Sequence, residues 1–434
     1  MSPFWRKKKQ QVCVIGLDGV PYTLVKRFTE DGTMPALAEI VRAGHLSKMC
    51  VTLPEISAVS WPSFMTGKNP GWHSIFGFTD LKPNSYSLRF PSFGDLRAPT
   101  IWDKIGERRK RSVVINQPST YPARPIEGVL ISGFVAISLC KAVHPPSILP
   151  KLEQDGYIID IDTTRAKDHA YLTGELVKTL DSRERITNYF WENEDWDFFE
   201  VVVTGTDRLH HYLWDALDNE THPYHKMFLD YYRRVDAFVG RMYSRFRKLT
   251  DTADPTPGFF ILSDHGFTGV RQEFYLNNWL KKEGFLKLQT PDADSIEAIA
   301  EGTRAFALDP SRIYLNMVGK HPKGSVKPED VRPILTDIKA GLSELSLDGE
   351  RIMQHVFERD AVYDGPFASQ GPDLVAVSNY GFDIKGSLKQ PKLFGRSVLT
   401  GMHTWDDAFL WSAHKPPENL NITDVAGMIM QHME

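Results

Sequence analysis

Short apolar runs that end at acidic residues recur along the chain. Residues 11–17 lead into Asp18, residues 197–203 (DFFEVVV) lead into a polar TGTD segment, and residues 259–263 lead into Asp264. Apolar runs of four to eight residues are typical of strands covered on both faces. In open α/β sheets, ligands bind beyond the carboxyl ends of such strands. The pattern therefore predicts buried parallel strands whose ends carry a site.

Longer segments with apolar positions at helical spacing separate these runs. Residues 22–44 predict one helix that ends near Gly44, and residues 170–192 and 223–243 predict two more. Residues 112–116 predict a further strand. This alternation is typical of an α/β fold, and we expect a doubly wound, mainly parallel central sheet with helices on both faces.

Two segments depart from the alternation. Residues 54–78 are rich in Ser, Pro, Gly and aromatic side chains, and we expect an irregular wall of the active site there rather than a regular element. Residues 305–318 and 330–345 predict a small α+β insertion at about 268–370, after which residues 373–378 read as the returning strand. The expected organisation is one catalytic domain over residues 1–434 with that insertion inside it.

Composition narrows the classes of partner. A formal charge of -4 gives no general affinity for nucleic acid or an anionic membrane. No run of about 18 apolar residues is present, so no transmembrane segment is expected. Three widely spaced cysteines favour a reducing compartment, and we expect a cytoplasmic protein. We interpret the basic start, with Lys7–Lys9, as a solvated tail rather than a signal peptide or lipid anchor.

Six side chains of metal-ligand type follow the predicted strands or lie on glycine-flanked turns: Asp18, Asp207, His211, Asp264, His265 and His403. Such a mixture suits Zn²⁺, Mn²⁺ or Fe better than Ca²⁺. Six ligands divide into two sites of three that leave positions open for substrate, as two-metal phosphoester chemistry requires. Asp207 and His211 are four residues apart, so a helix that begins near Thr206 would present both on one face.

Each of these residues also has a structural interpretation when taken alone. Asp18 could cap the next helix, Asp207 and His211 could form a surface pair, and His403 could be a hydrogen-bonded loop histidine. A nucleophile is not fixed by spacing either. The 54–78 segment offers three serines for that role: Ser57, Ser60 and Ser63.

The order of the motifs resembles the alkaline phosphatase superfamily. The chain carries LDG at 17–19, TGKNPGWHSI at 66–75, D-x-x-x-H at 207–211, SDHG at 263–266 and G-x-H at 401–403. The most similar branch is the type I phosphodiesterase/nucleotide pyrophosphatase group, with its phosphohydrolase/phosphomutase-like relatives. The resemblance extends from residue 12 to about residue 412.

This resemblance implies a role for each candidate residue. Ser57, nine residues before Thr66, falls at the position of the family's nucleophile. Two divalent ions are implied, Zn²⁺ as the first expectation and Mn²⁺ as the second. One ion would be held beside Ser57 by Asp18, Asp264 and His265, with the Ser57 oxygen as a further ligand, and the other ion by Asp207, His211 and His403. The implied reaction forms a covalent phospho-seryl intermediate from a small-molecule phosphoester, and water at the second ion then hydrolyses it.

One substitution relative to the family bears on substrate choice. Ser60 stands where nucleotide pyrophosphatase relatives carry an asparagine that holds a phosphoryl oxygen, and its hydroxyl could donate in that place. We expect a phosphodiesterase first. A phosphomonoesterase or phosphomutase is the alternative within the superfamily, and a catalytically inactive metal-binding scaffold or regulatory protein is the alternative of another class.

Overall fold

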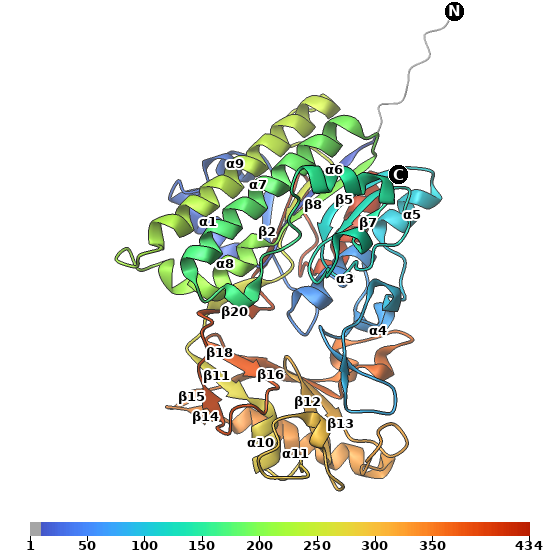
Figure 1. The fold of residues 1–434 in the computed structure, drawn as a ribbon, viewed down its shortest axis with the longest axis vertical. Helices are drawn as coiled ribbons and strands as arrows, with labels where there is room; N and C mark the ends of the chain where they lie inside the picture. The colour runs from blue at the N-terminus through green and yellow to red at the C-terminus, as the bar shows by residue number, and fades with distance from the viewer. Residues whose placement is uncertain (1–9) are drawn as a thin grey trace, which may run out of the picture.

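A computed structural model describes residues 10–434 (Figure 1). The interpretation of Lys7–Lys9 as a solvated tail falls outside the described residues. Within residues 10–434, no helix has the length and apolar character needed to cross a membrane.

The centre of the upper part in Figure 1 is an eight-stranded sheet with the order β2-β21-β9-β1-β8-β5-β6-β7. Strands β9, β1, β8, β5 and β6 are parallel to one another, whereas β2, β21 and β7 add antiparallel pairings. Its strands are β1 (Val12–Leu17), β2 (His45–Met49), β5 (Ser112–Gln117), β6 (Gly128–Ser132), β7 (Val143–His144), β8 (Phe198–Val203), β9 (Phe259–Leu262) and β21 (Ala408–Ser412). The predicted mainly parallel sheet is confirmed.

Helices cover both faces of this sheet because β1 is apolar on both sides. Cys13 and Ile15 point into one core, whereas Val12 and Val14 point into another. The first face is covered by α1 (Tyr22–Glu30), α2 (Pro35–Ala43), α6 (Leu149–Gln154), α7 (His169–Asn193), α8 (Gly205–Leu213) and α9 (His225–Thr250). The second face is covered by α3 (Ser57–Thr66), α5 (Ile101–Glu107) and α13 (Ile422–His432). The doubly wound arrangement is therefore also confirmed.

Two local predictions for residues 22–78 were wrong. Residues 22–44 form two helices rather than one, because the chain turns between them at Gly32, whose φ of 82° is left-handed. Residues 54–78 contain the regular helix α3 and the short helix α4 (Pro70–His73). Every residue of α3 is buried, so the helix has no polar face and its sequence shows no amphipathic period.

The lower part of Figure 1 has an apolar core of its own, built mainly from residues 274–388. It contains a four-stranded sheet of β12 (Ala305–Leu308), β13 (Arg312–Leu315), β17 (Leu374–Ser378) and β16 (Met353–Glu358). A three-stranded sheet holds β18 (Phe382–Lys385), β11 (Gln272–Tyr275) and β19 (Phe394–Gly395), and the helices are α10 (Leu276–Lys282), α11 (Val331–Glu344) and α12 (Arg359–Val362). The prediction that residues 373–378 are the returning strand was therefore wrong, because β17 belongs to this second core and the chain re-enters the central sheet only at β21. The insertion limits of about 268–370 stay a prediction.

A short antiparallel pair lies where the chain passes between the two parts. Strand β10 (Gly266–Gly269) pairs with β20 (Gly401–Thr404), and Phe267 lies opposite His403. This register brings His403 beside His265, although the two residues are far apart in the sequence. The remaining strands are β3 (Asp80–Leu81), β4 (Leu88–Arg89), β14 (Ser346–Leu347) and β15 (Glu350–Arg351).

Candidate active site

Three aspartates converge beyond the carboxyl ends of the central parallel strands. Asp18 follows β1 directly, Asp264 follows β9, and Asp207 lies in the first turn of α8 after β8. Since these three strands are neighbours and parallel, their ends meet at one sheet edge. All three side chains are buried. Helix α1 begins at Tyr22 with Pro21 as its cap, so Asp18 is not a helix cap.

Ser57 stands at the first position of α3, against this aspartate cluster. Its Oγ donates to Asp18 Oδ1 at 3.2 Å and lies 3.1 Å from His265 Nε2. The start of a helix also carries free backbone N–H groups and the positive end of the helix dipole, which favour an anionic group nearby. The hydroxyl is thus held between a carboxylate and an imidazole, at a place suited to a phosphoryl group.

The other two candidate hydroxyls have different surroundings. Ser63 Oγ donates to the Val59 carbonyl and contacts Thr52 and His73, so it is occupied by structural contacts. Ser60 is fully buried one turn after Ser57, and its Oγ has no hydrogen-bond partner among residues 10–434. Of the three serines, Ser57 is the one in contact with the acidic cluster.

Asp18, Asp264 and His265 form one group of possible metal ligands, with ligand atoms within 4.8 Å of one another. His265 Nε2 lies 3.7 Å from Asp18 Oδ1 and 3.4 Å from Asp264 Oδ2. Neighbouring groups fix both carboxylates: Trp61 Nε1 donates to Asp18 Oδ2 at 3.1 Å, and the Gly19 amide donates to Asp264 Oδ1 at 3.0 Å. Asp264 Oδ2 has no hydrogen-bond partner within residues 10–434.

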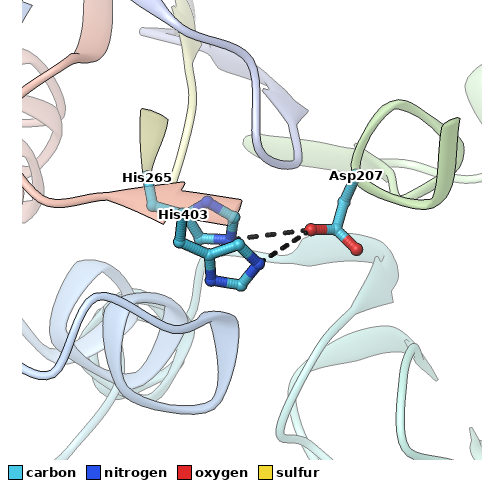
Figure 2. Close-up of side chains that lie close together, drawn as sticks. All are labelled: Asp207, His265 and His403. Atoms are coloured by element: carbon cyan, nitrogen blue, oxygen red, sulfur yellow. Dashed lines mark ion pairs between the residues drawn. The ribbon is translucent and has the colours of Figure 1, made fainter. Parts of the chain in front are cut away.

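A second group is centred on Asp207. Figure 2 shows its Oδ1 facing His403 and His265, whose Nε2 atoms lie at 3.3 Å and 3.9 Å. His211 Nε2 lies 3.4 Å from the same oxygen and 3.0 Å from His403 Nε2. His265 is therefore placed between the two groups, because its Nε2 faces all three aspartates.

Backbone carbonyls orient two of these imidazoles. His403 Nδ1 lies 2.8 Å from the Glu55 carbonyl oxygen, and His265 Nδ1 lies 3.0 Å from that of Gly266. A carbonyl accepts only from a protonated nitrogen, so the proton of each neutral ring belongs on Nδ1. Each Nε2 then carries a lone pair directed at the acidic cluster, the arrangement that metal-binding histidines use.

The pKa shifts of the cluster indicate whether its side chains are suited to binding a cation. Burial, reinforced by Asp264 and Asp207, raises the pKa of Asp18 well above its ordinary value. Burial also raises the pKa of Asp264 to about 7, against the lowering effect of the Gly19 amide. Burial and the proximity of His403 lower the pKa of His265 to about 4. Crowded buried carboxylates beside neutral imidazoles are costly without a cation, and the donor set fits divalent ions.

The pKa of Asp207 shifts in the opposite direction. Burial alone would raise it, but His211, His403 and Arg208 together lower the pKa well below its usual range. These contacts favour the ionised form of Asp207. Its neighbour His210 takes no part, since it contacts the Gly19 carbonyl through Nδ1 and the Tyr232 hydroxyl through Nε2.

Two features of the site had no signal in the sequence. Arg208 bridges Asp207 and Asp160, which lies in the loop between α6 and α7. Glu55 lines a cavity of about 240 Å³ that opens beside His211 and His403 and reaches the lower part of the molecule. Burial, with a smaller contribution from Asp383, raises the pKa of Glu55 to about 7.

The solved structures similar to this chain share its fold. Phosphonoacetate hydrolase from Sinorhizobium meliloti, in complex with phosphonoacetate, is 16% identical with a TM-score of 0.66, over 98% of this chain and 96% of that chain. Human ectonucleotide pyrophosphatase / phosphodiesterase 5 is 13% identical with a TM-score of 0.56, over 98% and 94%. Alkaline phosphatase PafA is 13% identical with a TM-score of 0.55, over 98% and 96%. At these identities the likeness shows a shared fold.

The family model described as "Type I phosphodiesterase / nucleotide pyrophosphatase" matches residues 12–406. The chain belongs to this family, and it is a hydrolase of phosphoric ester bonds. Dependence on divalent metal ions is typical of this family, and the two groups of possible metal ligands agree with it. A search of curated proteins gave no match.

Proposed function

We propose that this enzyme hydrolyses phosphodiesters of small molecules, with Ser57 as nucleophile and two divalent metal ions as cofactors. The observation that carries the proposal is the position of Ser57 Oγ, 3.2 Å from Asp18 and 3.1 Å from His265 at the start of a buried helix. A hydroxyl in that position can lose its proton beside a carboxylate and meet a phosphoryl group at the helix N-terminus.

The six predicted ligands divide between the ions as their contacts suggest. One ion would be held by Asp18, Asp264 and His265, and the other by Asp207, His211 and His403. Zn²⁺ is the first candidate and Mn²⁺ the second, because both accept carboxylate and imidazole ligands. When bound, such a pair stabilises the negative charge that develops on the entering and leaving oxygens.

The side chains of this chain account for the remaining steps. Ser57 Oγ forms a bond to phosphorus as the bond to the first alcohol breaks, and the serine proton leaves with that alcohol. Ser60 would donate its free hydroxyl to a phosphoryl oxygen one helical turn away. A water molecule then attacks phosphorus, and its proton returns Ser57 to the hydroxyl form.

The test compares bis-p-nitrophenyl phosphate with p-nitrophenyl phosphate after loading the protein with Zn²⁺ or Mn²⁺. We expect the diester to have the higher kcat/KM, and Ser57→Ala to lower kcat by at least about a thousandfold. Ser244→Ala, an exposed position on α9, is the matched control and should not change kcat. A higher kcat/KM for the monoester would favour the phosphomonoesterase alternative. Metal binding without turnover of either ester would favour the inactive scaffold.

We also retain a cytoplasmic location as a proposal. Its support is that Cys13, Cys50 and Cys140 are all free, as expected in a reducing compartment.

A further inference from the structure

A cavity of about 240 Å³ adjoins the proposed catalytic centre on the side of His211 and His403. Its near wall is Glu55, Ile56 and Phe78, and its far wall comes from the lower part of the molecule, through Asp309–Ser311 and Asp383–Lys385. If Ser57 is the nucleophile, as the proposed function holds, a phosphoester that reaches it would place one of its alcohol groups in this cavity.

Two groups on the cavity wall lack partners within the chain. Ser311 is 3% exposed, and its Oγ has no hydrogen-bond partner among residues 10–434. Glu55 is only partly buried, but its Oε2 atom is also buried and without a hydrogen-bond partner among residues 10–434, while its backbone carbonyl accepts from His403. Buried polar atoms normally have partners, so the Glu55 oxygen lacks a hydrogen-bond donor, whereas the Ser311 hydroxyl could either donate or accept.

The charges on the wall favour a cation over an anion. Three carboxylates line the cavity, Glu55, Asp309 and Asp383, against the single ammonium of Lys385. Lys385 Nζ is already paired with Asp383 Oδ2 at 2.6 Å. Lys385 is thereby committed to Asp383. Of the other two carboxylates, Asp309 accepts from the Gly386 amide through Oδ1, and Glu55 adds a further acidic group to the wall. A second phosphate in this cavity would meet like charges, which disfavours its binding.

The volume of the cavity and the aromatic side chains that line it further restrict the kind of alcohol group that can bind there. Pockets for drug-sized ligands occupy roughly 300–1,000 Å³, so this smaller space suits a short alcohol rather than a nucleoside. Quaternary ammonium groups are bound by cages of several aromatic rings. Phe78 is the one Phe, Tyr or Trp side chain among the described residues that line this cavity. The recognition chemistry here is hydrogen bonding to carboxylates.

We propose that the cavity binds a short alcohol group of the substrate that carries a primary ammonium, with Glu55 and Asp309 facing its N–H donors and Ser311 available to its oxygen. The substrates of this enzyme are then phosphoesters of small amino alcohols. Esters whose alcohol bears a further phosphate are poor substrates.

The test uses four p-nitrophenyl phosphodiesters whose second alcohol is ethanolamine, choline, ethylene glycol or a phosphate-bearing glycol. With metal-loaded protein, we expect kcat/KM for the ethanolamine ester to exceed that for the glycol ester about tenfold or more, as a charge-assisted hydrogen bond allows. The choline ester should lie between them, and the phosphate-bearing ester should be poorest. Asp309→Asn and Glu55→Gln should each reduce the ethanolamine preference, whereas the exposed Asp330→Asn should not.

A binding measurement keeps this inference separate from the proposed function. Metal-loaded Ser57→Ala protein is titrated with the ethanolamine and glycol esters in a calorimeter, where turnover is not needed. Tighter binding of the ethanolamine ester supports the cavity assignment even if no ester is hydrolysed by the wild type. Equal binding, or tighter binding of the phosphate-bearing ester, overturns the assignment even if every ester is hydrolysed.

Discussion

Arg208 holds one carboxylate oxygen of Asp207 and leaves the other facing three histidines. Its Nη1 donates to Asp207 Oδ2 at 3.0 Å, while Oδ1 lies 3.3 Å from His403 Nε2 and 3.4 Å from His211 Nε2. Arg208 is itself fixed by Asp160, whose Oδ2 accepts from Nη2 at 2.7 Å and from Nε at 3.1 Å. The pair therefore sets the orientation of a proposed metal ligand without touching the ion.

Replacing Arg208 should weaken metal binding before it changes the fold. In Arg208→Met, Asp207 loses the contact that fixes Oδ2, and groups that orient metal ligands are typically worth about 10- to 100-fold in affinity. Asp160→Asn should act in the same direction and more weakly. Equilibrium dialysis with metal analysis measures both effects. The control is Arg234→Met, which removes an exposed ion pair between Arg234 on α9 and Asp181 on α7. Unchanged affinity in Arg208→Met would contradict the orienting role.

Removing metal should expose the repulsion among the buried carboxylates. We expect chelation to lower the melting temperature and Zn²⁺ to restore it. An ion that binds only the folded state, at a free concentration 100 times its Kd, adds about 2.7 kcal/mol to the free energy of unfolding. Differential scanning fluorimetry at pH 8 measures the change. A melting temperature that does not respond to chelator would count against a metal site.

The substitution Asp264→Asn tests the same repulsion among buried carboxylates by the same melting measurement. Asp264 has a folded-state pKa raised to about 7 by burial, so in the metal-free protein it destabilises the fold increasingly as pH rises from about 4 to 7. The neutral asparagine lacks this penalty. We expect the metal-free variant to melt above metal-free wild type at pH 8 and to lose most of its response to Zn²⁺. A metal-free variant that melts lower at pH 8 would show that burial of the charge is not the dominant cost.

A buried glutamate outside the site should give the fold a separate pH dependence. Glu200 lies in the middle of β8, fully buried, and burial raises its pKa to about 8. A raised carboxyl pKa means that the folded state binds an extra proton between about pH 4.5 and 8, so stability falls as pH rises through that window. Glu200→Gln should flatten this loss. Denaturant unfolding at pH 5 and pH 8.5 measures it, and an equally steep loss in the variant would refute the assignment.

Local sequence patterns account for the parts of the site that follow strands. The ends of β1 and β9 could be predicted because an apolar run stops at Asp18 or Asp264, and α8 because of the spacing of Asp207 and His211. Helix α3 could not be recognised, because a helix that is buried on all sides has no polar face and so shows no periodic pattern of apolar and polar residues.

Contacts between distant segments have no such local signal. Asp160 reaches Arg208 across 48 positions, and His403 meets the backbone of Glu55 across 348. Ser311 lines the cavity from the lower part of the molecule, and the sequence around it contains no recognisable motif. These relationships depend on tertiary packing, which residue spacing does not encode.

The central claim, that Ser57 attacks phosphorus, is tested most directly by the stereochemistry of the reaction. A chiral phosphorothioate diester is hydrolysed in isotopically heavy water by the metal-loaded enzyme, and the configuration of the product is determined. Two successive in-line displacements, one by Ser57 and one by water, predict retention of configuration at phosphorus. Inversion would mean that water attacks the substrate directly, and it would contradict the account.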